Sequence, residues 1–363
     1  MMKSKVYFTS ARLSDGIAGI QQKLDRLLAQ SRILDIVQEN DTVAIKMHFG
    51  EVGNTGYVLP EYMRVICERI ARMKATPILS DTNTLYQGKR TNSKDHLQLA
   101  YEHGFRPEVV LAQVEIPDDT NQENCIEIPI DKKFIKTAKI AKFYYDAEAL
   151  VDVAHFKGHI MTGFGGVLKN IGMGCATREG KLAQHSDVSP FVKAKQCVGC
   201  KECLLVCPVK AIEMKSNVAV IDGALCIGCA SCIAACKKYA IEVNWESGGS
   251  KIQEKMVEYA LAVLKNKKEK AAFINFAMKI TKECDCLAKD DPRIAPDIGI
   301  CASSDPVSID KACMDLINKA SGKDVFKASH PNRDGTKQLT YAAQLGLGNL
   351  EYELITVGEG QEF

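Results

Sequence analysis

The sequence predicts an α/β protein in which a layered, mostly parallel sheet domain is interrupted by a small cysteine-rich insert. Short apolar segments alternate with amphipathic segments on both sides of the insert, which is typical of a parallel sheet covered by helices. Eight of the 15 cysteines fall between Cys197 and Cys236, and the 363 residues are enough for two domains. We expect the first part of the α/β domain at residues 1–187, the insert at 188–246 and the second part of the α/β domain at 247–363.

The segments before the insert have the patterns of alternating strands and helices. Residues 42–49 are apolar and rich in β-branched side chains, as in a buried strand. The next segment is amphipathic and begins with Pro60, which is pre-organised for the first turn of a helix. Helices are predicted at residues 60–75 and 92–103, and further strands at residues 77–80 and 149–155.

The alternation continues after the insert. Residues 251–264 have a helical pattern, and the sequence SSDP at 303–306 predicts the capped start of another helix that ends near residue 320. Strands are predicted at residues 271–276, 298–302 and 352–357. The insert would therefore lie in a loop of the sheet and return the chain to the same core.

The insert consists of two copies of a cysteine motif. Each copy reads C-x2-C-x2-C-x3-C, and the copies are offset by 29 residues. Three thiolates two residues apart can bind three corners of a cubane cluster from one loop, whereas the fourth points toward the opposite copy. The predicted ligands are Cys197, Cys200, Cys203 and Cys236 for cluster one, and Cys226, Cys229, Cys232 and Cys207 for cluster two. Two zinc sites or a disulfide network are the alternatives, but zinc sites usually pair two C-x2-C units.

This segment closely resembles the bacterial two-cluster ferredoxins, small α+β proteins that transfer single electrons. The resemblance implies a ferredoxin-like domain with two [4Fe–4S] clusters. Lys237 stands after the last cysteine, where that family usually has a second proline, and Pro208 occupies the matching position of the first copy. Since this proline shapes the turn and is not a ligand, cluster binding is still expected.

Polar side chains follow the predicted strands of the α/β domain. In an open parallel sheet the ligand crevice lies beyond the carboxyl ends of the strands, so we expect these side chains to converge there. Histidine titrates near neutral pH and can pass protons to a substrate that receives electrons. The predicted catalytic residues of this crevice are His48, Asp81, His155, Lys157 and Lys169. The alternative is that loops after strands are simply polar.

A glycine-rich turn at residues 163–166 precedes a predicted helix. Free amide N–H groups and the positive end of the helix dipole favour an anion at such a place. The turn is neither a G-x-G-x-x-G motif nor a Walker loop, so no nucleotide motif applies. The predicted cofactor-binding residues are Gly163, Gly165, Gly166 and Asn170. A tight packing turn is the alternative.

Three cysteines outside the insert lie in predicted loops. Cys175 follows the glycine-rich turn, and Cys284 and Cys286 follow the strand at 271–276. Alternate residues of an extended segment face the same side, which suits shared coordination or a reactive pocket. The candidate third site, for an additional metal ion such as iron or zinc, comprises Cys175, Cys284, Cys286, His159 and His185. A redox-active thiol pair and inert reduced cysteines are the alternatives.

Five stretches resemble the domain of unknown function 362 family, in its iron–sulfur branch. They are KMHFGEVGNTGYV (46–58), SDTNTLYQGKRTN (80–92), HFKGHIMTGFGGVLKNIGMGC (155–175), ECDC (283–286) and PDIGICASSDPVSID (296–310), and they are spread over nearly the whole chain. The resemblance implies a cytoplasmic iron–sulfur protein of the kind found in anaerobes and archaea. It implies no particular reaction.

The composition excludes several classes of partner. Lys and Arg number 47 against 45 Asp and Glu, and a net charge of +2 provides no drive toward nucleic acid or an anionic membrane. No apolar run approaches the ~20 residues of a membrane-spanning helix. Lys3 and Lys5 are not followed by the apolar block of a secretory signal, so we expect a cytoplasmic protein with no nucleic-acid or membrane partner.

The leading functional hypothesis is a redox enzyme. A redox partner protein or low-potential electron donor would reduce the insert, which would pass electrons to an anionic small molecule in the strand-end crevice. An electron carrier or adaptor without chemistry of its own is the main alternative, and a sensor that responds to cluster loss is the third. A deep crevice lined by the polar groups favours the enzyme, whereas a crevice filled by apolar side chains favours the carrier.

Overall fold

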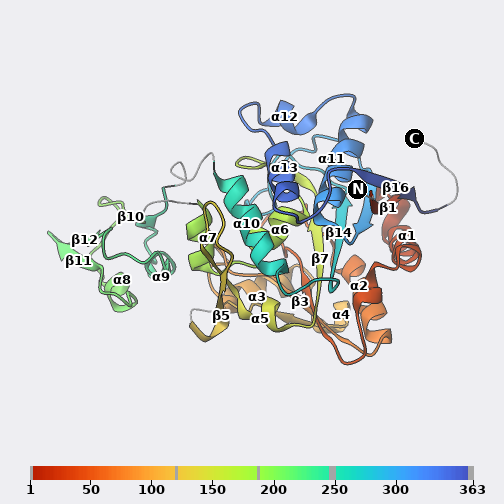
Figure 1. Ribbon diagram of the computed structural model, residues 1–363. Coiled ribbons are helices and arrows are strands. Elements are labelled where there is room, and N and C mark those ends of the chain that lie inside the picture. The colour runs from red at the N-terminus through yellow and green to blue at the C-terminus, as the bar shows by residue number, and fades with distance from the viewer. Residues whose placement is uncertain (1–2, 119–121, 186–188, 245–250, 359–363) are drawn as a thin grey trace.

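The computed structural model describes residues 3–118, 122–185, 189–244 and 251–358 (Figure 1). Its central element is an eight-stranded sheet with the order β16-β1-β15-β14-β7-β2-β3-β4. In chain order the strands are β1 (Ser4–Ser10), β2 (Thr42–Lys46), β3 (Thr76–Ser80), β4 (Gln113–Glu115), β7 (Ala149–His155), β14 (Ala271–Ala277), β15 (Gly299–Ser303) and β16 (Tyr352–Thr356). The predicted strand at 42–49 ends three residues early, and the one at 149–155 has the predicted bounds.

Five consecutive strands of the sheet, β14, β7, β2, β3 and β4, run parallel. Their carboxyl ends therefore lie at one edge. β15 is antiparallel to both β14 and β1, while β1 is parallel to β16. The sheet is thus mostly parallel, as predicted, with one reversed strand. The connection from β14 to β15 contains no helix, unlike the usual crossover between parallel strands, and it joins these two strands as antiparallel neighbours.

Helices cover both faces of the sheet (Figure 1). Alternation along β14 shows how the two cores arise, because Phe273 and Ala277 pack on one face and Ile274 and Phe276 on the other. The first face carries α6 (Val167–Gly174), α10 (Ile252–Leu264), α11 (Pro306–Ser321), α12 (Val325–Ser329) and α13 (Thr336–Gln344). The second face carries α1 (Gly16–Ser31), α2 (Pro60–Arg72), α3 (Ser93–Glu102) and α4 (Pro107–Val110).

Local sequence explains where these helices begin. α2 starts at Pro60 and buries Met63, Ile66 and Ile70, which share one helical face. Asp305 caps α11, because its side chain accepts hydrogen bonds from the N–H groups of Val307 and Ser308. The remaining helices of the α/β domain are short: α5 (Lys142–Asp146), α7 (Arg178–His185), and the 3-10 turns η1 (Leu13–Asp15), η2 (Ile33–Ile36) and η3 (Gln122–Asn124). Two hairpins complete it, β5 (Cys125–Pro129) with β6 (Thr137–Ala141) and β8 (Lys157–His159) with β9 (Gly163–Gly165).

The cysteine-rich segment forms a small lobe beside the sheet domain, drawn in green at the left of Figure 1. Its elements are β10 (Phe191–Val192), α8 (Glu202–Leu205), β11 (Ile212–Lys215), β12 (Val218–Ile221), α9 (Ser231–Ala235) and β13 (Ile241–Glu242). β10 pairs with β13 and β11 with β12, both antiparallel. The predicted limits of the insert, at residues 187 and 188 and at 246 and 247, lie outside the described residues.

The lobe repeats its backbone conformation at the 29-residue offset of the sequence. Gly199 and Gly228 both have a φ of +71°, a left-handed conformation that favours glycine. Lys201 and Ala230, the residues before α8 and α9, are also left-handed. Within the described ranges, none of the helices combines the length and apolarity needed to cross a membrane.

Candidate functional site

The loops that follow β14, β7, β2 and β3 meet at the carboxyl edge of the sheet. Asp285, from the loop after β14, accepts a hydrogen bond from His155 Nδ1 at 2.9 Å, and His155 is the last residue of β7. The backbone N–H of Glu51, after β2, donates to the carbonyl of Asp285 at 3.1 Å. Arg90, from the loop after β3, pairs with Glu51 at 3.1 Å. The four loops therefore form one connected site, which we call the strand-end site.

A buried ion pair lies beneath this site. Lys46 Nζ is 3.1 Å from Asp81 Oδ1, and both side chains are almost fully shielded from solvent. Asn170 accepts a hydrogen bond from Lys46 at 2.8 Å and donates one to Asp152 at 2.8 Å. Burial alone would raise the pKa of Asp81, but the charges around it, of which Lys46 is the strongest, hold the pKa below its usual range. Asp81, predicted to be catalytic, and Asn170, predicted to bind a cofactor, thus both have partners within the protein.

Arg90 links the predicted catalytic residue His48 to two carboxylates. Its guanidinium is 2.9 Å from His48 Nε2 and 3.4 Å from Asp81, and its own pKa is raised although burial opposes this. Burial, followed by the charge of Arg90, lowers the pKa of His48 to about 3. His48 is therefore neutral at pH 7, contrary to the expectation of a histidine that titrates near neutral pH. It is half-buried, so one edge of the site reaches solvent.

The two cysteines after β14 lie close to His159. The Sγ atoms of Cys284 and Cys286 and a ring nitrogen of His159 are all within 4.8 Å of one another. Lys169 Nζ is 3.4 Å from Cys284 Sγ, and the backbone N–H of Cys286 also approaches that sulfur at 3.4 Å. His159, Cys284 and Cys286 could hold a metal ion. They could equally form a thiol pair.

The electrostatics of the pair are asymmetric. A hydrogen bond from Cys286, together with Lys169 and His159, holds the pKa of Cys284 well below its usual range although burial opposes it. The same hydrogen bond raises the pKa of Cys286 well above its usual range. Cys284 is therefore the thiol of the pair that ionises more readily, and Cys286 the one that keeps its proton more readily. Burial, followed by Lys169, lowers the pKa of His159 to about 4, so this ring is neutral at pH 7.

A buried carboxylate fixes the loop that carries these cysteines. Asp285 is fully buried between His155 and Lys157, and the Lys157 ammonium is 3.4 Å from its Oδ2. These two side chains hold the pKa of Asp285 below its usual range, against the effect of burial. Gly56 packs so closely that a Cβ there would be 2.6 Å from Asp285 Oδ1. The predicted catalytic residues His155 and Lys157 thus position Asp285 and, through it, the thiol pair.

The glycine-rich turn is engaged within the protein. Gly163 and Gly165 belong to β9, which pairs with β8. The first two N–H groups of α6 donate to the carboxylate of Asp310 at 2.8 and 3.0 Å, and a Cβ on Gly166 would be 2.3 Å from that carboxylate. The helix N-terminus therefore binds an anion, but this anion is a side chain of α11 rather than an external ligand.

Two residues of the candidate third site are not part of the thiol group. Cys175 is buried in the core, and it follows α6, so the helical residues after Lys169 carry it about 9 Å along the helix axis. His185 lies near His159, whose proximity, after burial, lowers the pKa of His185 to about 3. The loops that directly follow the strands thus converge at one edge of the sheet. Cys175 does not join them, because α6 separates it from that edge.

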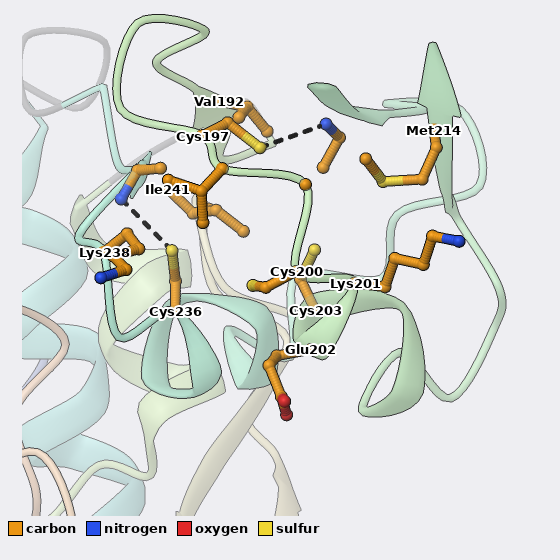
Figure 2. A pocket seen from close by; sticks show the side chains of 14 residues that line it. Val192, Cys197, Cys200, Lys201, Glu202, Cys203, Met214, Cys236, Lys238 and Ile241 are labelled. Carbon is orange, nitrogen blue, oxygen red and sulfur yellow. Dashed lines mark hydrogen bonds between the residues drawn. The ribbon is translucent and has the colours of Figure 1, made fainter. Parts of the chain in front are cut away.

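The eight cysteines of the insert gather around two separate cavities. Cys197, Cys200, Cys203 and Cys236 line the first, and Figure 2 shows their sulfur atoms facing a shared space. Cys207, Cys226, Cys229 and Cys232 line the second. These are the two crossed sets that the spacing predicts. Equivalent backbone N–H groups, of Ala240 and Ala211, approach the sulfurs of Cys236 and Cys207 at 3.2 Å in both halves.

The insert touches the strand-end site through three consecutive residues of the loop after β3. Leu85 packs in the small core of the insert. The Gln87 side-chain amide donates to the carbonyl of Ile233 in α9. Between them, the hydroxyl of Tyr86 donates to the carbonyl of Cys286 at 2.8 Å. We call residues 85–87 the bridging segment, because it contacts both the core and α9 of the insert and the carbonyl of Cys286.

A family model for a domain of unknown function, DUF362, matches residues 43–315, which include every loop of the strand-end site. The chain belongs to the DUF362 family. No curated protein matches its sequence. The matched range also contains the insert, so the family match embraces both of the cysteine-bearing regions described above.

Two solved structures are similar to this DUF362 protein. The lactate racemase apoprotein from Thermoanaerobacterium thermosaccharolyticum has 15% sequence identity and a TM-score of 0.39, over 76% of this chain and 51% of that chain. A structural-genomics target from Thermotoga maritima has 12% identity and a TM-score of 0.42, over 85% of this chain and 59% of that chain. This chain therefore spans less than two thirds of the length of either protein.

Sequence reasoning missed three charged residues that organise the DUF362 site: Arg90, Asp285 and Asp310. Asp285 lies between two cysteines that were singled out, and Arg90 lies in one of the stretches that resemble the family. A search for charges within those stretches would have found both. The partners of these residues are distant in sequence, so no local pattern identifies their roles.

Proposed function

We propose that this protein binds two [4Fe–4S] clusters in its insert and acts as a redox enzyme that passes their electrons to the strand-end site. One observation carries the proposal. The cysteine sets that line the two cavities are the crossed sets in which each copy of the motif lends its fourth thiolate to the other copy. A pair of zinc sites would not require this exchange.

The surroundings of the cysteines suit a cluster. Backbone N–H groups close to the sulfurs of Cys207, Cys236 and Cys197 supply the hydrogen bonds that help to set the reduction potential of such clusters. Gly199 and Gly228 permit the left-handed turns between ligands. When bound, the clusters would supply single electrons. The thiolates of the chain would hold them, and the amides would tune them.

The contacts of the insert suggest an order of electron transfer. Cys200, a ligand in the first set, is exposed, so an external donor would reach cluster one directly. The second set lies on the side that faces the α/β domain, since Cys226 and Gly228 line a cavity together with Leu182, Lys255 and Tyr259. Electrons would therefore enter at cluster one, pass to cluster two and leave through the bridging segment.

One observation favours the alternative of an electron carrier or adaptor. Most charged groups of the strand-end site are buried and already paired with one another, as Lys46 is with Asp81 and Asp285 is with Lys157. A substrate would have to approach the half-buried His48 and Cys286. The enzyme and the carrier therefore differ in whether these two residues take part in electron transfer.

Anaerobic purification followed by iron and sulfide analysis tests the cluster proposal. We expect about eight irons per chain and the spectroscopic signals of reduced [4Fe–4S] centres. Cys203→Ser should remove mainly cluster one and Cys232→Ser mainly cluster two. Cys125→Ser, at a half-buried cysteine of β5, is the matched control and should keep the full iron content. A chain that binds zinc at these cysteines after anaerobic purification would refute the proposal.

Reoxidation of the reduced protein separates the enzyme from the carrier. Oxidised glutathione serves as an anionic two-electron probe and a viologen dye as a one-electron probe. In an enzyme, His48→Ala slows reoxidation by the anionic probe and leaves reoxidation by the dye unchanged. In a carrier, both rates remain those of the unmodified protein.

A further inference from the structure

The Sγ atom of Cys284 lies where three groups stabilise one negative charge. They are the ammonium of Lys169 at 3.4 Å, the backbone N–H of Cys286 at 3.4 Å, and the imidazole of His159. Cys284 itself is buried, so water does not weaken these interactions. The surroundings are those of a thiolate rather than of an inert thiol.

The hydrogen bonds of His159 argue against a metal ion here. Its Nδ1 accepts the N–H groups of Met161 and Thr162 at 3.1 and 3.2 Å. A neutral imidazole with Nδ1 as the acceptor carries its proton on Nε2, so Nε2 is a donor and has no lone pair for a metal. His159 is therefore built to donate a hydrogen bond to a thiolate.

Charge and ligand number lead to the same conclusion. The Lys169 ammonium lies beside Cys284 Sγ, where it would repel a bound cation. Without His159, only the two sulfurs remain as ligands of the group found among the described residues. Catalytic zinc sites use three protein ligands and structural sites four. The candidate third site thus fits thiol chemistry better than metal binding.

We infer that Cys284 and Cys286 form a redox-active pair that alternates between a disulfide and a dithiol and receives the electrons of the insert. This inference rests on the proposed function. The two sulfurs lie within 4.8 Å of each other, so closure to a disulfide needs only a local movement of this loop. Cys286 is half-buried and gives the pair access to solvent.

The step balances with the two clusters as the electron source. Reduction breaks the S–S bond and consumes two electrons and one proton. After reduction, Cys284 is the thiolate beside Lys169, and Cys286 is the thiol that carries the proton. The eight cysteines of the insert would hold two one-electron clusters, and these together would supply the two electrons that the step consumes. Oxidation of the dithiol by an external disulfide would follow by thiol–disulfide exchange.

The bridging segment supplies the connection. Tyr86 contacts Cys286 through its hydroxyl, while the neighbouring Leu85 and Gln87 contact the half of the insert that contains Cys232. No other contact of the described residues that we identify joins the thiol pair to the insert so directly. The segment therefore joins the pair to the insert through three consecutive residues.

Peptide mass analysis of the full-length holoprotein tests the inference. The protein is oxidised with diamide, reduced anaerobically with dithionite for increasing times, and alkylated with iodoacetamide. We expect the peptide that contains residues 284–286 to form an internal disulfide. Reduction of that disulfide should be roughly tenfold slower in Cys232→Ser, because direct reduction by dithionite replaces delivery through cluster two. Cys125→Ser controls for a general effect of cysteine substitution.

Iron content, measured on the same samples, separates two kinds of failure. A protein without iron–sulfur clusters overturns the proposed function, whatever the thiols do. A protein with both clusters whose residues 284 and 286 never form a disulfide overturns only the inference. So does an additional metal ion that is lost in Cys284→Ser while the cluster irons remain, because the thiols would then be metal ligands.

Discussion

Two pairs of cysteines in this chain bring their thiols into contact, and they lie beside charges of opposite sign. Cys284 and Cys286 lie next to the Lys169 ammonium. Cys301 in β15 and Cys313 in α11 are hydrogen-bonded to each other in the core, near the carboxylate of Asp310. The pKa of Cys284 falls well below its usual range, whereas burial, the contact with Cys301 and the charge of Asp310 raise that of Cys313.

The comparison teaches that proximity of two thiols does not make them reactive. A buried cation stabilises a thiolate, and a buried anion or an apolar core keeps the thiol protonated. Both charges lie at the first turn of α6, since Asp310 of α11 accepts the N-terminal N–H groups of α6 and Lys169 is the third residue of α6. The N-terminus of α6 therefore lies between the cation beside Cys284 and the anion beside Cys313.

We call Cys284 and Cys286 the loop pair, and Cys301 and Cys313 the core pair. Asp285→Ala should have the largest effect on stability, because it removes the anchor of the loop pair and leaves the core pair unchanged. The variant leaves the buried Lys157 without its carboxylate, and breaking a buried ion pair in this way costs about 3–5 kcal/mol. Denaturant unfolding measures this loss in the free energy of unfolding. Asp285→Asn keeps an acceptor for His155 and should lose less. Equal stability of Asp285→Ala and the unmodified protein would show that the loop is held in some other way.

Asp310→Asn tests the anion beside the core pair. Burial raises the pKa of Asp310 to about 6, above its value of ~4 in the unfolded chain. The folded protein therefore holds this proton more tightly, and the associated stability is fully present below about pH 4 and is lost as the pH rises through about 6. We expect this pH dependence, of ~3 kcal/mol, to disappear in Asp310→Asn.

Unfolding curves between pH 4 and 7 measure that difference. Asp315→Asn, at a partly exposed carboxylate on the same helix, is the matched control. A pH dependence that survives unchanged in Asp310→Asn would contradict the assigned role of this carboxylate.

Lys169→Met tests the cation beside the loop pair. Removal of the ammonium raises the pKa of the Cys284 thiol, and a free thiol with a pKa of ~8.5 is only a few per cent ionised at pH 7. Alkylation of Cys284 by iodoacetamide should slow roughly tenfold, because the thiolate is the reacting form. Lys169→Arg keeps the charge and should keep most of the rate. Unchanged alkylation in Lys169→Met would remove the basis of the comparison.

Cys313→Ala should have the smallest effect. The core pair contributes packing rather than chemistry, so the variant should lose ~1 kcal/mol of stability and none of the redox behaviour of Cys284 and Cys286. Thermal unfolding and the alkylation rate at Cys284 measure the two effects. A change in the alkylation rate would mean that the two thiol pairs are coupled.

Local patterns predicted the parallel part of the sheet well, because burial on both faces gives each strand a continuous apolar run. β7 has the predicted bounds, and the helix predicted at 60–75 is α2 (Pro60–Arg72). The direction of β15 was not predictable in this way, since a strand has the same pattern in either direction. Its reversal is seen only in the pairing of β15 with β14 and β1.

The site was predictable in outline but not in its pairings. Strand ends converge by topology, which brought His48, His155 and Cys284 to one edge. The partners of these residues depend on packing between distant segments, such as the contact of Asp310 with the start of α6. Cys175 shows the limit of prediction from topology. The glycine-rich turn before it lies near the strand ends, but α6 carries Cys175 away from them.

The bridging segment makes the insert and the thiol pair thermodynamically linked. Gln87 binds α9 while Tyr86 holds the carbonyl of Cys286, so a displacement of the insert would be transmitted to the thiol loop through these two hydrogen bonds. Because linkage is reciprocal, a change in the thiol loop must alter the free energy of assembling the insert by the same amount. The oxidation state of Cys284 and Cys286 would then change how firmly the insert retains iron. The loop after β3 would transmit this effect.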